Sequence, residues 1–174
     1  DEDRVKMAET GNGLNDDELL AFLTVLMVAG NETTRNAITG GLLALSRFPD
    51  QRALMIEHLD DEAFMATAAD ELVRYVTPVL GFIRTVTVDH EYRNTKLKEG
   101  DRVLMLYGGA NRDPRVFVDP DVLDLTRSPN PHLGFGIGPH FCLGAHLARL
   151  EMTEMLRHLL RRAPGLTAGE PTWV

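Results

Sequence analysis

The longest regular pattern in the sequence begins after Asn15 and ends before Pro49. Residues 19–28 are apolar on nearly every side of a helix, which is typical of a helix buried inside a domain. Asn15 is a good N-cap, and the three acidic residues after it suit the positive end of a helix. We therefore predict one helix of roughly thirty residues, about 45–50 Å long at 1.5 Å per residue. We expect it to end at about Phe48.

Polar residues interrupt the middle of this predicted helix. Residues 29–34 read Ala-Gly-Asn-Glu-Thr-Thr, so a glycine is followed by polar side chains in a segment that otherwise looks buried. Such interruptions often mark a local widening or kink at a functional site. We expect a distortion of the helix here.

The remaining pattern predicts shorter elements. Helices are indicated where apolar residues recur every three to four positions, and strands where β-branched residues alternate. The predicted helices span 51–58, 61–75 and 143–162, and the predicted strands span 82–88 and 103–107, with turns at 94–95 and 99–100. Residues 108–130 are rich in loops. The expected fold class is mainly α with a small antiparallel β-sheet, in a single domain over residues 1–174.

Composition narrows the class of protein. The chain has 174 residues, 44% of them hydrophobic, which is enough to bury a core. Its formal net charge of −8 argues against a nucleic-acid partner. The single cysteine excludes an internal disulfide and fits a reducing compartment. The longest apolar run is too short to span a bilayer. We expect a soluble, cytoplasmic protein.

The single cysteine, Cys142, has unusual neighbours. Three glycines and a proline precede it within eight residues, Gly144 follows it, and a helical pattern then begins. Backbone N–H groups at the start of a helix favour a thiolate, which can be a nucleophile or a metal ligand. Three other interpretations stay open: a small buried apolar residue, a zinc ligand with His146, or a Cys–His nucleophile pair.

Two further polar pairs stand out. Glu71 and Arg74 are three residues apart in the predicted helix 61–75, so they share a face and can form an ion pair. Glu32 and Thr33 lie in the interrupted part of the first helix. By itself, each pair could belong to an ordinary polar helix face.

The order of the three patterns along the chain is more informative than any one of them. Ala-Gly-x-Glu-Thr at 29–33 comes first, Glu-x-x-Arg at 71–74 second, and Phe-Gly-x-Gly-x-His-x-Cys-x-Gly at 135–144 last. Together they resemble the cytochrome P450 family of haem-thiolate monooxygenases. The resemblance runs from the long first helix onward and matches the C-terminal part of a family member. It implies the corresponding part of the P450 fold, so we expect the N-terminal part and the final hairpin after Trp173 to be absent.

The resemblance also implies a cofactor and its contacts. The cofactor is haem b with the thiolate of Cys142 as axial iron ligand, the ligation known for this family. Glu32 and Thr33 match the catalytic acid–alcohol pair that delivers protons to dioxygen. The residues matching cofactor-binding positions are Ala29, Gly30, Arg84, His132, Phe135, Gly136, His140, Cys142 and Gly144. Among them, Arg84, His132 and His140 match positions that contact the haem propionates.

Other expectations follow from the same resemblance. Glu71, Arg74 and Arg127 match the structural ion-pair core of the family. The implied activity is insertion of one oxygen atom of O2 into a C–H bond of a hydrophobic substrate. Residues 30–36 and 77–79 resemble actinobacterial members that oxidise sterol side chains, and apolar residues 79–82 would line the pocket.

The implied electron donors are a ferredoxin and its reductase. Arginines of the last helix are candidates for the docking face of such an acidic partner; these are Arg149, Arg157, Arg161 and Arg162. The alternative is that the chain is an incomplete fragment that folds in part, does not hold haem stably and does not turn over.

Overall fold

The computed structural model describes residues 13–169 of the chain. They fall into two parts, with the boundary between Thr33 and Thr34, and each part is described by itself. The expectations for residues 1–12 and for Trp173 lie outside the described residues.

Helix α2 (Asp16–Arg47) confirms the long predicted helix. The side chain of Asn15 accepts a hydrogen bond from the amide of Glu18 at 2.9 Å, and the carboxylate of Glu18 accepts one from the amide of Asn15 at 2.9 Å. This reciprocal cap satisfies two of the amides that a helix start leaves without partners.

The expected widening of α2 at residues 29–34 is absent, because the α-helix continues regularly through them. The hydroxyls of Thr24 and Thr33 donate to the carbonyls four residues earlier, Leu20 and Ala29, at 2.8 Å and 2.5 Å. A threonine that bonds back to its own helix in this way needs no break in the helix to satisfy its hydroxyl.

The predicted burial of residues 19–28 is wrong for the described structure. Leu20, Val25 and Met27 are 66%, 63% and 75% exposed. The described residues up to Thr33 are one stretch of helix and the short segment before it, so the apolar side chains have no second element to pack against within this part.

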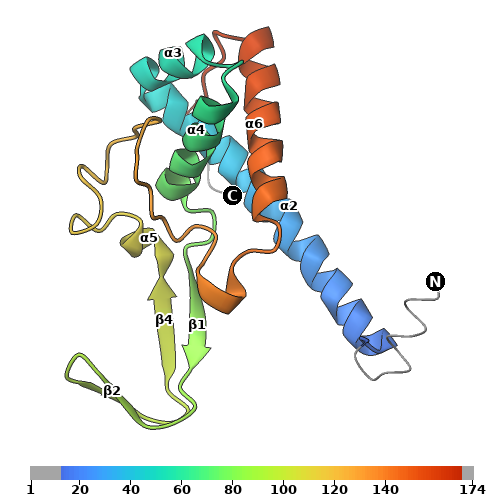
Figure 1. The fold of residues 1–174 in the computed structure, drawn as a ribbon, viewed down its shortest axis with the longest axis vertical. Coiled ribbons are helices and arrows are strands. Elements are labelled where there is room, and N and C mark those ends of the chain that lie inside the picture. The colour runs from blue at the N-terminus through green and yellow to red at the C-terminus, as the bar shows by residue number, and fades with distance from the viewer. Residues whose placement is uncertain (1–12, 170–174) are drawn as a thin grey trace. The chain divides into compact units, whose positions relative to one another are not determined.

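The core of the main part, residues 34–169, lies between helices. The last turns of α2 are joined there by α3 (Pro49–Glu57), α4 (Glu62–Val76) and α6 (Ala145–Arg162), which gather together in Figure 1. The carboxylate of Asp61 caps α4 by accepting from the amide of Phe64 at 3.0 Å. Fully buried apolar side chains fill the space between the helices, among them Leu45, Met55, Met65, Leu72, Met152, Leu156 and Leu160.

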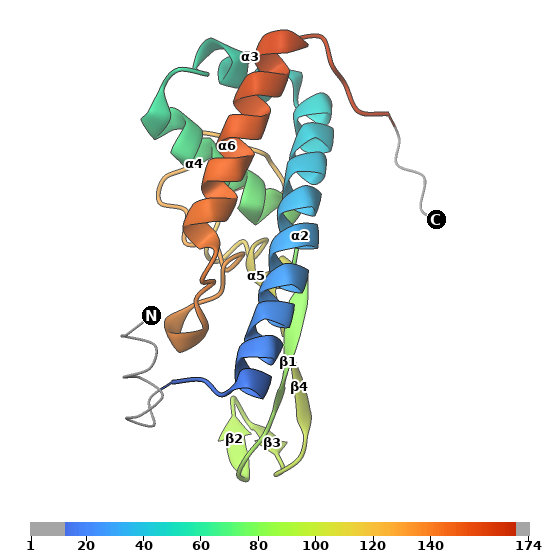
Figure 2. The same cartoon turned by 90° about the vertical axis from the view of Figure 1, so that its right-hand side faces the viewer.

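The strands form two small antiparallel sheets. Strand β1 (Gly81–Thr85) pairs with β4 (Arg102–Leu106), with Ile83 opposite Leu104. Strand β2 (His90–Tyr92) pairs with β3 (Thr95–Leu97) in a hairpin visible in Figure 2. The fold class is therefore as predicted, although the predicted strand 82–88 extends three residues too far and the hairpin was not foreseen.

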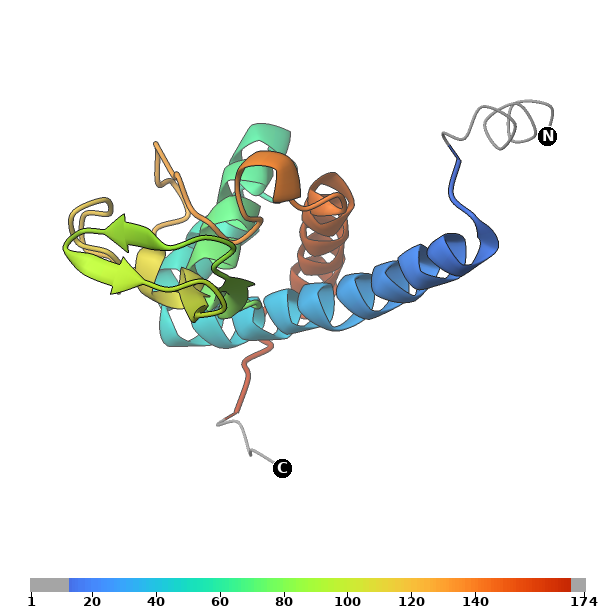
Figure 3. The same ribbon diagram turned by 90° about the horizontal axis from the view of Figure 1, so that it is seen from below.

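The chain between β4 and α6 is mostly irregular. It contains one short helix, α5 (Tyr107–Ala110), and one 3-10 turn, η1 (Gly138–His140). Figure 3 shows the strands to one side of α4 and α6. Among residues 13–169, no helix combines the length and the apolar character needed to cross a membrane.

Candidate functional site

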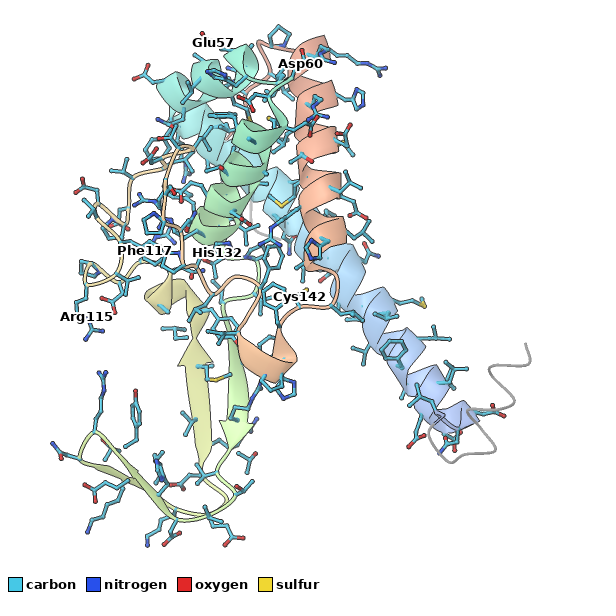
Figure 4. All side chains as sticks on the ribbon, viewed as in Figure 1. Glu57, Asp60, Arg115, Phe117, His132 and Cys142 are labelled. Atoms are coloured by element: carbon cyan, nitrogen blue, oxygen red, sulfur yellow. The ribbon has the colours of Figure 1, made fainter. Side chains whose placement is uncertain are left out.

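Cys142 lies on an exposed loop immediately before α6 (Figure 4). Gly136 and Gly138 both have φ +71°, a conformation that side chains with a Cβ rarely adopt. The amide of Cys142 donates to the carbonyl of Phe135 at 2.8 Å and closes the loop. We call residues 132–144 the cysteine loop. Because the thiol is exposed, the interpretation of Cys142 as a small buried residue is wrong for this structure.

The surface around Cys142 is apolar. Ile137 and Leu143 are 77% and 75% exposed, and Phe141 and Leu147 are about half exposed. No described residue accepts a hydrogen bond from the amide of Leu143 or of Gly144 through its backbone. An exposed sulfur next to free amides can serve as a metal ligand, and the apolar side chains around it suit an apolar ligand.

The structure gives no support to the zinc interpretation. Among the described residues, no group of three or more His, Cys, Asp or Glu side chains is arranged to hold a metal ion. Zinc sites built from protein side chains need at least three such ligands.

Three aromatic rings of the cysteine loop lie next to one another. The Phe135 ring lies 5.7 Å from the His132 ring and 6.4 Å from the Phe141 ring, measured between centroids. Phe135 also packs against the helical core. The loop is thus fixed to the main part on one side and open on the other.

Both ring nitrogens of His132 have partners within the chain. Nδ1 accepts from the amide of Gly134 at 3.1 Å, and Nε2 lies 3.4 Å from an oxygen of Asp70. With Nδ1 as acceptor, the proton of the neutral ring is assigned to Nε2, facing the carboxylate. A contact with a haem propionate, as expected for His132, requires one of these two interactions to give way.

Asp70 also binds Arg149 of α6. The distance from Nε of Arg149 to Oδ1 of Asp70 is 2.7 Å, and the guanidinium lies over the Phe135 ring at 4.5 Å. Burial alone would raise the pKa of Asp70, but the hydrogen bonds from His132 and Arg149 prevail and hold that pKa below its ordinary value. The carboxylate therefore stays charged near neutral pH.

The predicted ion pair is the centre of a buried network. The side chains of Glu71 and Arg74 are fully buried and meet at 2.7 Å and 2.8 Å through two parallel hydrogen bonds. Glu71 also accepts from Arg127 at 3.1 Å, as predicted, and from Asn130 at 3.1 Å. The remaining donors of Arg74 reach backbone carbonyls.

Asn111 joins this network to the cysteine loop. Its carbonyl accepts from Arg74 at 2.8 Å, and its side-chain oxygen accepts from the amide of Leu133 at 2.7 Å. Its side-chain nitrogen donates to the hydroxyl of Thr77 at 2.9 Å. Sequence reasoning missed this residue because an asparagine in a loop-rich segment looks like an ordinary turn residue. Only its complete burial identifies it.

The remaining predicted site residues belong to β1, to η1 and to helix α2. Arg84 is exposed on β1, donates to the carbonyl of Ile83 at 3.2 Å, and is in none of the ion pairs recorded for the described residues. His140 is exposed on η1. Four more belong to the part of the chain that ends at Thr33, namely Ala29, Gly30, Glu32 and Thr33. The structure therefore places His132, Phe135, Gly136, His140, Cys142 and Gly144 in one loop.

Three of the four arginines of α6 that are candidates for a docking face are paired with acids of the same chain. Arg149 is bound to Asp70, and Arg157 contacts Glu62 at 2.7 Å and also Glu154. Arg161 contacts Asp60 at 2.5 Å. These side chains hold α6 to α4 and to the turn before it. Their charges are neutralised within the chain, so they are weaker attractors for an acidic partner.

Comparisons with known proteins point to one family. A family model described as Cytochrome P450 matches residues 2–163. The chain is 50% identical to a "Methyl-branched lipid omega-hydroxylase" of Mycobacterium tuberculosis over 161 residues, which are 92% of this chain and 37% of that protein. It is 45% identical to a "Steroid C26-monooxygenase" of Mycolicibacterium smegmatis over 157 residues, which are 90% of this chain and 36% of that one.

A solved structure shares the fold. A Mycobacterium marinum cytochrome P450 in complex with pseudoionone superposes with a TM-score of 0.87 at 45% identity, over 94% of this chain and 39% of that chain. The chain thus spans little more than a third of the length of the curated relatives it matches.

Proposed function

The chain belongs to the cytochrome P450 family, and from that premise we propose that it carries the iron-ligand side of a haem-dependent monooxygenase. The single observation that carries the proposal is the exposed Cys142 at the end of a glycine-shaped loop, next to free amides and apolar side chains. The proposed substrate is a hydrophobic molecule, and the proposed reaction inserts one oxygen atom of O2 into one of its C–H bonds.

The residues present fit haem b. Cys142 would supply the axial thiolate, the amides of Leu143 and Gly144 would donate to its sulfur, and the apolar side chains around it would cover the ring. When bound, the cofactor supplies the activation of dioxygen, which needs two electrons and two protons for each oxygen atom inserted. Gly136 and Gly144 add no side chain to the loop, which would favour close approach of the ring.

Charged groups would hold the propionates. Arg84 is exposed and forms no ion pair with another residue of the described part, so its guanidinium can pair with a carboxylate, which is the partner arginine binds best. His140 is exposed on the same loop as Cys142 and can donate from its ring. Of the three proposed propionate contacts, His132 is the least available, because its ring already binds Asp70 and Gly134.

Proton delivery is assigned to Glu32 and Thr33. The hydroxyl of Thr33 donates to the carbonyl of Ala29, so it would turn from that carbonyl to give its proton to dioxygen while Oγ1 accepts a replacement proton. Glu32, the adjacent acid, would replace that proton. Ala29 has only a methyl side chain and Gly30 has none, so both would leave room for dioxygen beside them.

The proposed substrate class rests on the exposed apolar residues near β1 and on the names of two relatives. Leu80 and Phe82 are 66% and 50% exposed at the start of β1 and offer an apolar surface. Two relatives are named for oxidising a methyl-branched lipid and carbon 26 of a steroid. Both names refer to oxidation of a hydrophobic molecule, and on that ground the proposed substrate is a lipid or a sterol side chain.

The proposed partners are a ferredoxin and its reductase, and the proposed location is the cytoplasm. Since the arginines of α6 are paired with acids, an acidic donor would have to bind by other residues or displace these pairs. The second candidate function is an incomplete fragment that neither holds haem stably nor turns over. The chain's coverage of only 37% of a curated relative favours testing it directly.

The test is the reduced carbon monoxide spectrum after expression with haem. We expect a thiolate-type Soret band from the protein and its loss in Cys142→Ala, because alanine has no ligand atom. The matched control is His146→Ala, which removes an exposed side chain one turn beyond Cys142 and should keep the band. A band that survives Cys142→Ala contradicts the proposed ligand. Absence of haem in the 174-residue chain, with a band in a longer protein containing it, supports the fragment instead.

A further inference from the structure

Three side chains from separate elements meet behind the cysteine loop, and the proposed function gives none of them a joint role. They are Asp70 of α4, His132 of the loop and Arg149 of α6, and we call them the Asp70 cluster. The inference below rests on the proposed function, because it concerns the loop that would hold the haem.

Asp70 connects to the loop by two routes. Through His132, it reaches the amide of Gly134, which donates to the other ring nitrogen at 3.1 Å. Through Arg149, it reaches the ring of Phe135, which the guanidinium covers at 4.5 Å. The carbonyl of Phe135 accepts from the amide of Cys142 at 2.8 Å. Both routes therefore end on the two residues that begin the turn around the cysteine.

A single oxygen carries both routes. Oδ1 of Asp70 lies 3.4 Å from Nε2 of His132 and 2.7 Å from Nε of Arg149. The side chain of His132 is only 5% exposed, and those of Asp70 and Arg149 are 32% and 26% exposed, so water screens the three only in part. A partly buried carboxylate with two fixed donors orients both of them, which a freely exposed ion pair does not.

We propose that Asp70 is a positioning residue for the Cys142 thiolate: its carboxylate fixes the His132 ring and the Arg149 guanidinium, and these two hold Gly134 and Phe135 in the conformation that presents the sulfur. Asp70 does not touch the sulfur or the cofactor. It acts at a distance of two contacts, as outer residues commonly do around a metal ligand.

The chain contains a matched control pair. Asp60 and Arg161 also join the region of α4 to α6, but their side chains are 88% and 47% exposed, and neither contacts the cysteine loop. Asp60→Asn removes an aspartate–arginine pair between α6 and the turn just before α4. If only the attachment of α6 matters, the two asparagine variants should behave alike.

The experiment compares wild type, Asp70→Asn, Asp70→Glu and Asp60→Asn as haem-loaded proteins. The first measurement is the rate of haem loss to an excess of a haem-scavenging protein. For Asp70→Asn we expect loss to be about 10-fold faster, the lower end of the effect of removing an outer partner of a metal ligand. Asp70→Glu keeps the charge and should restore part of the difference, and Asp60→Asn should match wild type.

The second measurement is spectroscopic. In the reduced carbon monoxide complex, Asp70→Asn should show a larger share of the non-thiolate Soret band. In the same diamagnetic complex, nitrogen-15 NMR should find His132 protonated at Nε2 in wild type and in a mixture of tautomers in Asp70→Asn. A change in folding stability alone would not move the tautomer.

The proposal is overturned if the rate of haem loss, the Soret band and the His132 tautomer are all unchanged in Asp70→Asn. Equal effects of Asp60→Asn and Asp70→Asn also overturn it, because they indicate a general loosening of α6. If Asp70→Asn does not fold, Arg149→Lys decides: it keeps the positive charge but loses the planar group over Phe135, and a wild-type rate of haem loss then refutes the inference. If the wild-type protein lacks the thiolate band, the proposed function is refuted. In that case the tautomer of His132, measured in Asp70→Asn and wild type without cofactor, decides the role of Asp70.

Discussion

The ion-pair core and the cysteine loop are close neighbours with opposite characters. In the core, the side chains of Glu71 and Arg74 are fully buried, and every donor of the guanidinium has an acceptor. In the loop, Cys142 is exposed, and large apolar side chains beside it face away from the core. The difference shows which region stabilises the fold and which is left exposed. Buried polar contacts hold the ion-pair core in place, whereas the surface around Cys142 is open.

One residue connects the two regions. Asn111 binds Arg74 through its own carbonyl and Leu133 through its side chain. A change in the core should therefore reach the loop, whereas a change on the open face should stay local. The predictions below test this asymmetry through the free energy of unfolding, in order of decreasing effect.

The largest effect is expected in the core. Arg74→Met should lower the free energy of unfolding by about 3–5 kcal/mol, because it leaves the carboxylate of Glu71 buried without its main partner. Urea denaturation measures the loss. Arg115→Met is the control, since that arginine is 77% exposed and its surface pair with Asp113 should contribute little to stability. Equal losses in the two variants would contradict the central role of the core.

The second-largest loss of stability is expected at Asn111, which links the core to the loop. Asn111→Ala should cost about 1–3 kcal/mol, because the amide of Leu133 and the hydroxyl of Thr77 lose their partner in a buried place. Asn36→Ala removes an exposed asparagine from helix α2 and should be neutral or slightly stabilising, since alanine is the better helix former. Hydrogen exchange should also show faster exchange at Leu133 in the Asn111 variant only. Unchanged protection there would argue against the link.

A comparison of two glycines tests how closely the loop is pressed against α4. A Cβ on Gly134 would lie 2.5 Å from Cγ1 of Val73, whereas a Cβ on Gly144 would have no neighbour within 4 Å. Gly134→Ala should therefore cost about 1–3 kcal/mol through overpacking, and Gly144→Ala should stay within about 0.5 kcal/mol of wild type. Thermal or urea unfolding of both variants measures the difference. Equal stabilities would mean that the loop yields without cost.

The smallest effect concerns acid. The pKa of Asp70 is lowered from its ordinary 3.8 by its two hydrogen-bond donors. A lowered pKa in the folded state contributes stability above the unfolded value, and that contribution disappears as the pH falls through the folded value. The stability difference between wild type and Asp70→Asn should be complete near about pH 6 and shrink below 3.8. A difference independent of pH would show that the charge of Asp70 is not what stabilises the loop.

The sequence was most informative where local chemistry decides the structure. Asn15 and Asp61 start helices because their side chains cap amides three residues ahead. The effect of Pro49, which limits the end of the first helix, is local in the same way. The spacing of Glu71 and Arg74 placed them on one face, and the pair is present. The glycines before Cys142 predicted a tight turn, and two of them have positive φ.

What could not be predicted depends on contacts between distant residues. Asp70 and Arg149 are 79 positions apart, and nothing local pairs them. The predicted burial of residues 19–28 was wrong because an apolar pattern shows that a helix needs another segment to pack against but does not say which segment provides it. The β2–β3 hairpin is short and exposed, so its residues lack the alternation that identifies a strand.

Helix α4 presents adjacent carboxylates in two directions. Successive helical residues are turned by about 100° around the axis, so Asp70 looks toward α6 while Glu71 looks toward the buried arginines. The rotational setting of one helix thus determines two separate arrangements at once. Inserting one residue between the cap at Asp61 and position 70 would turn both acids away from their cations together, whereas the same insertion before the cap would leave both untouched.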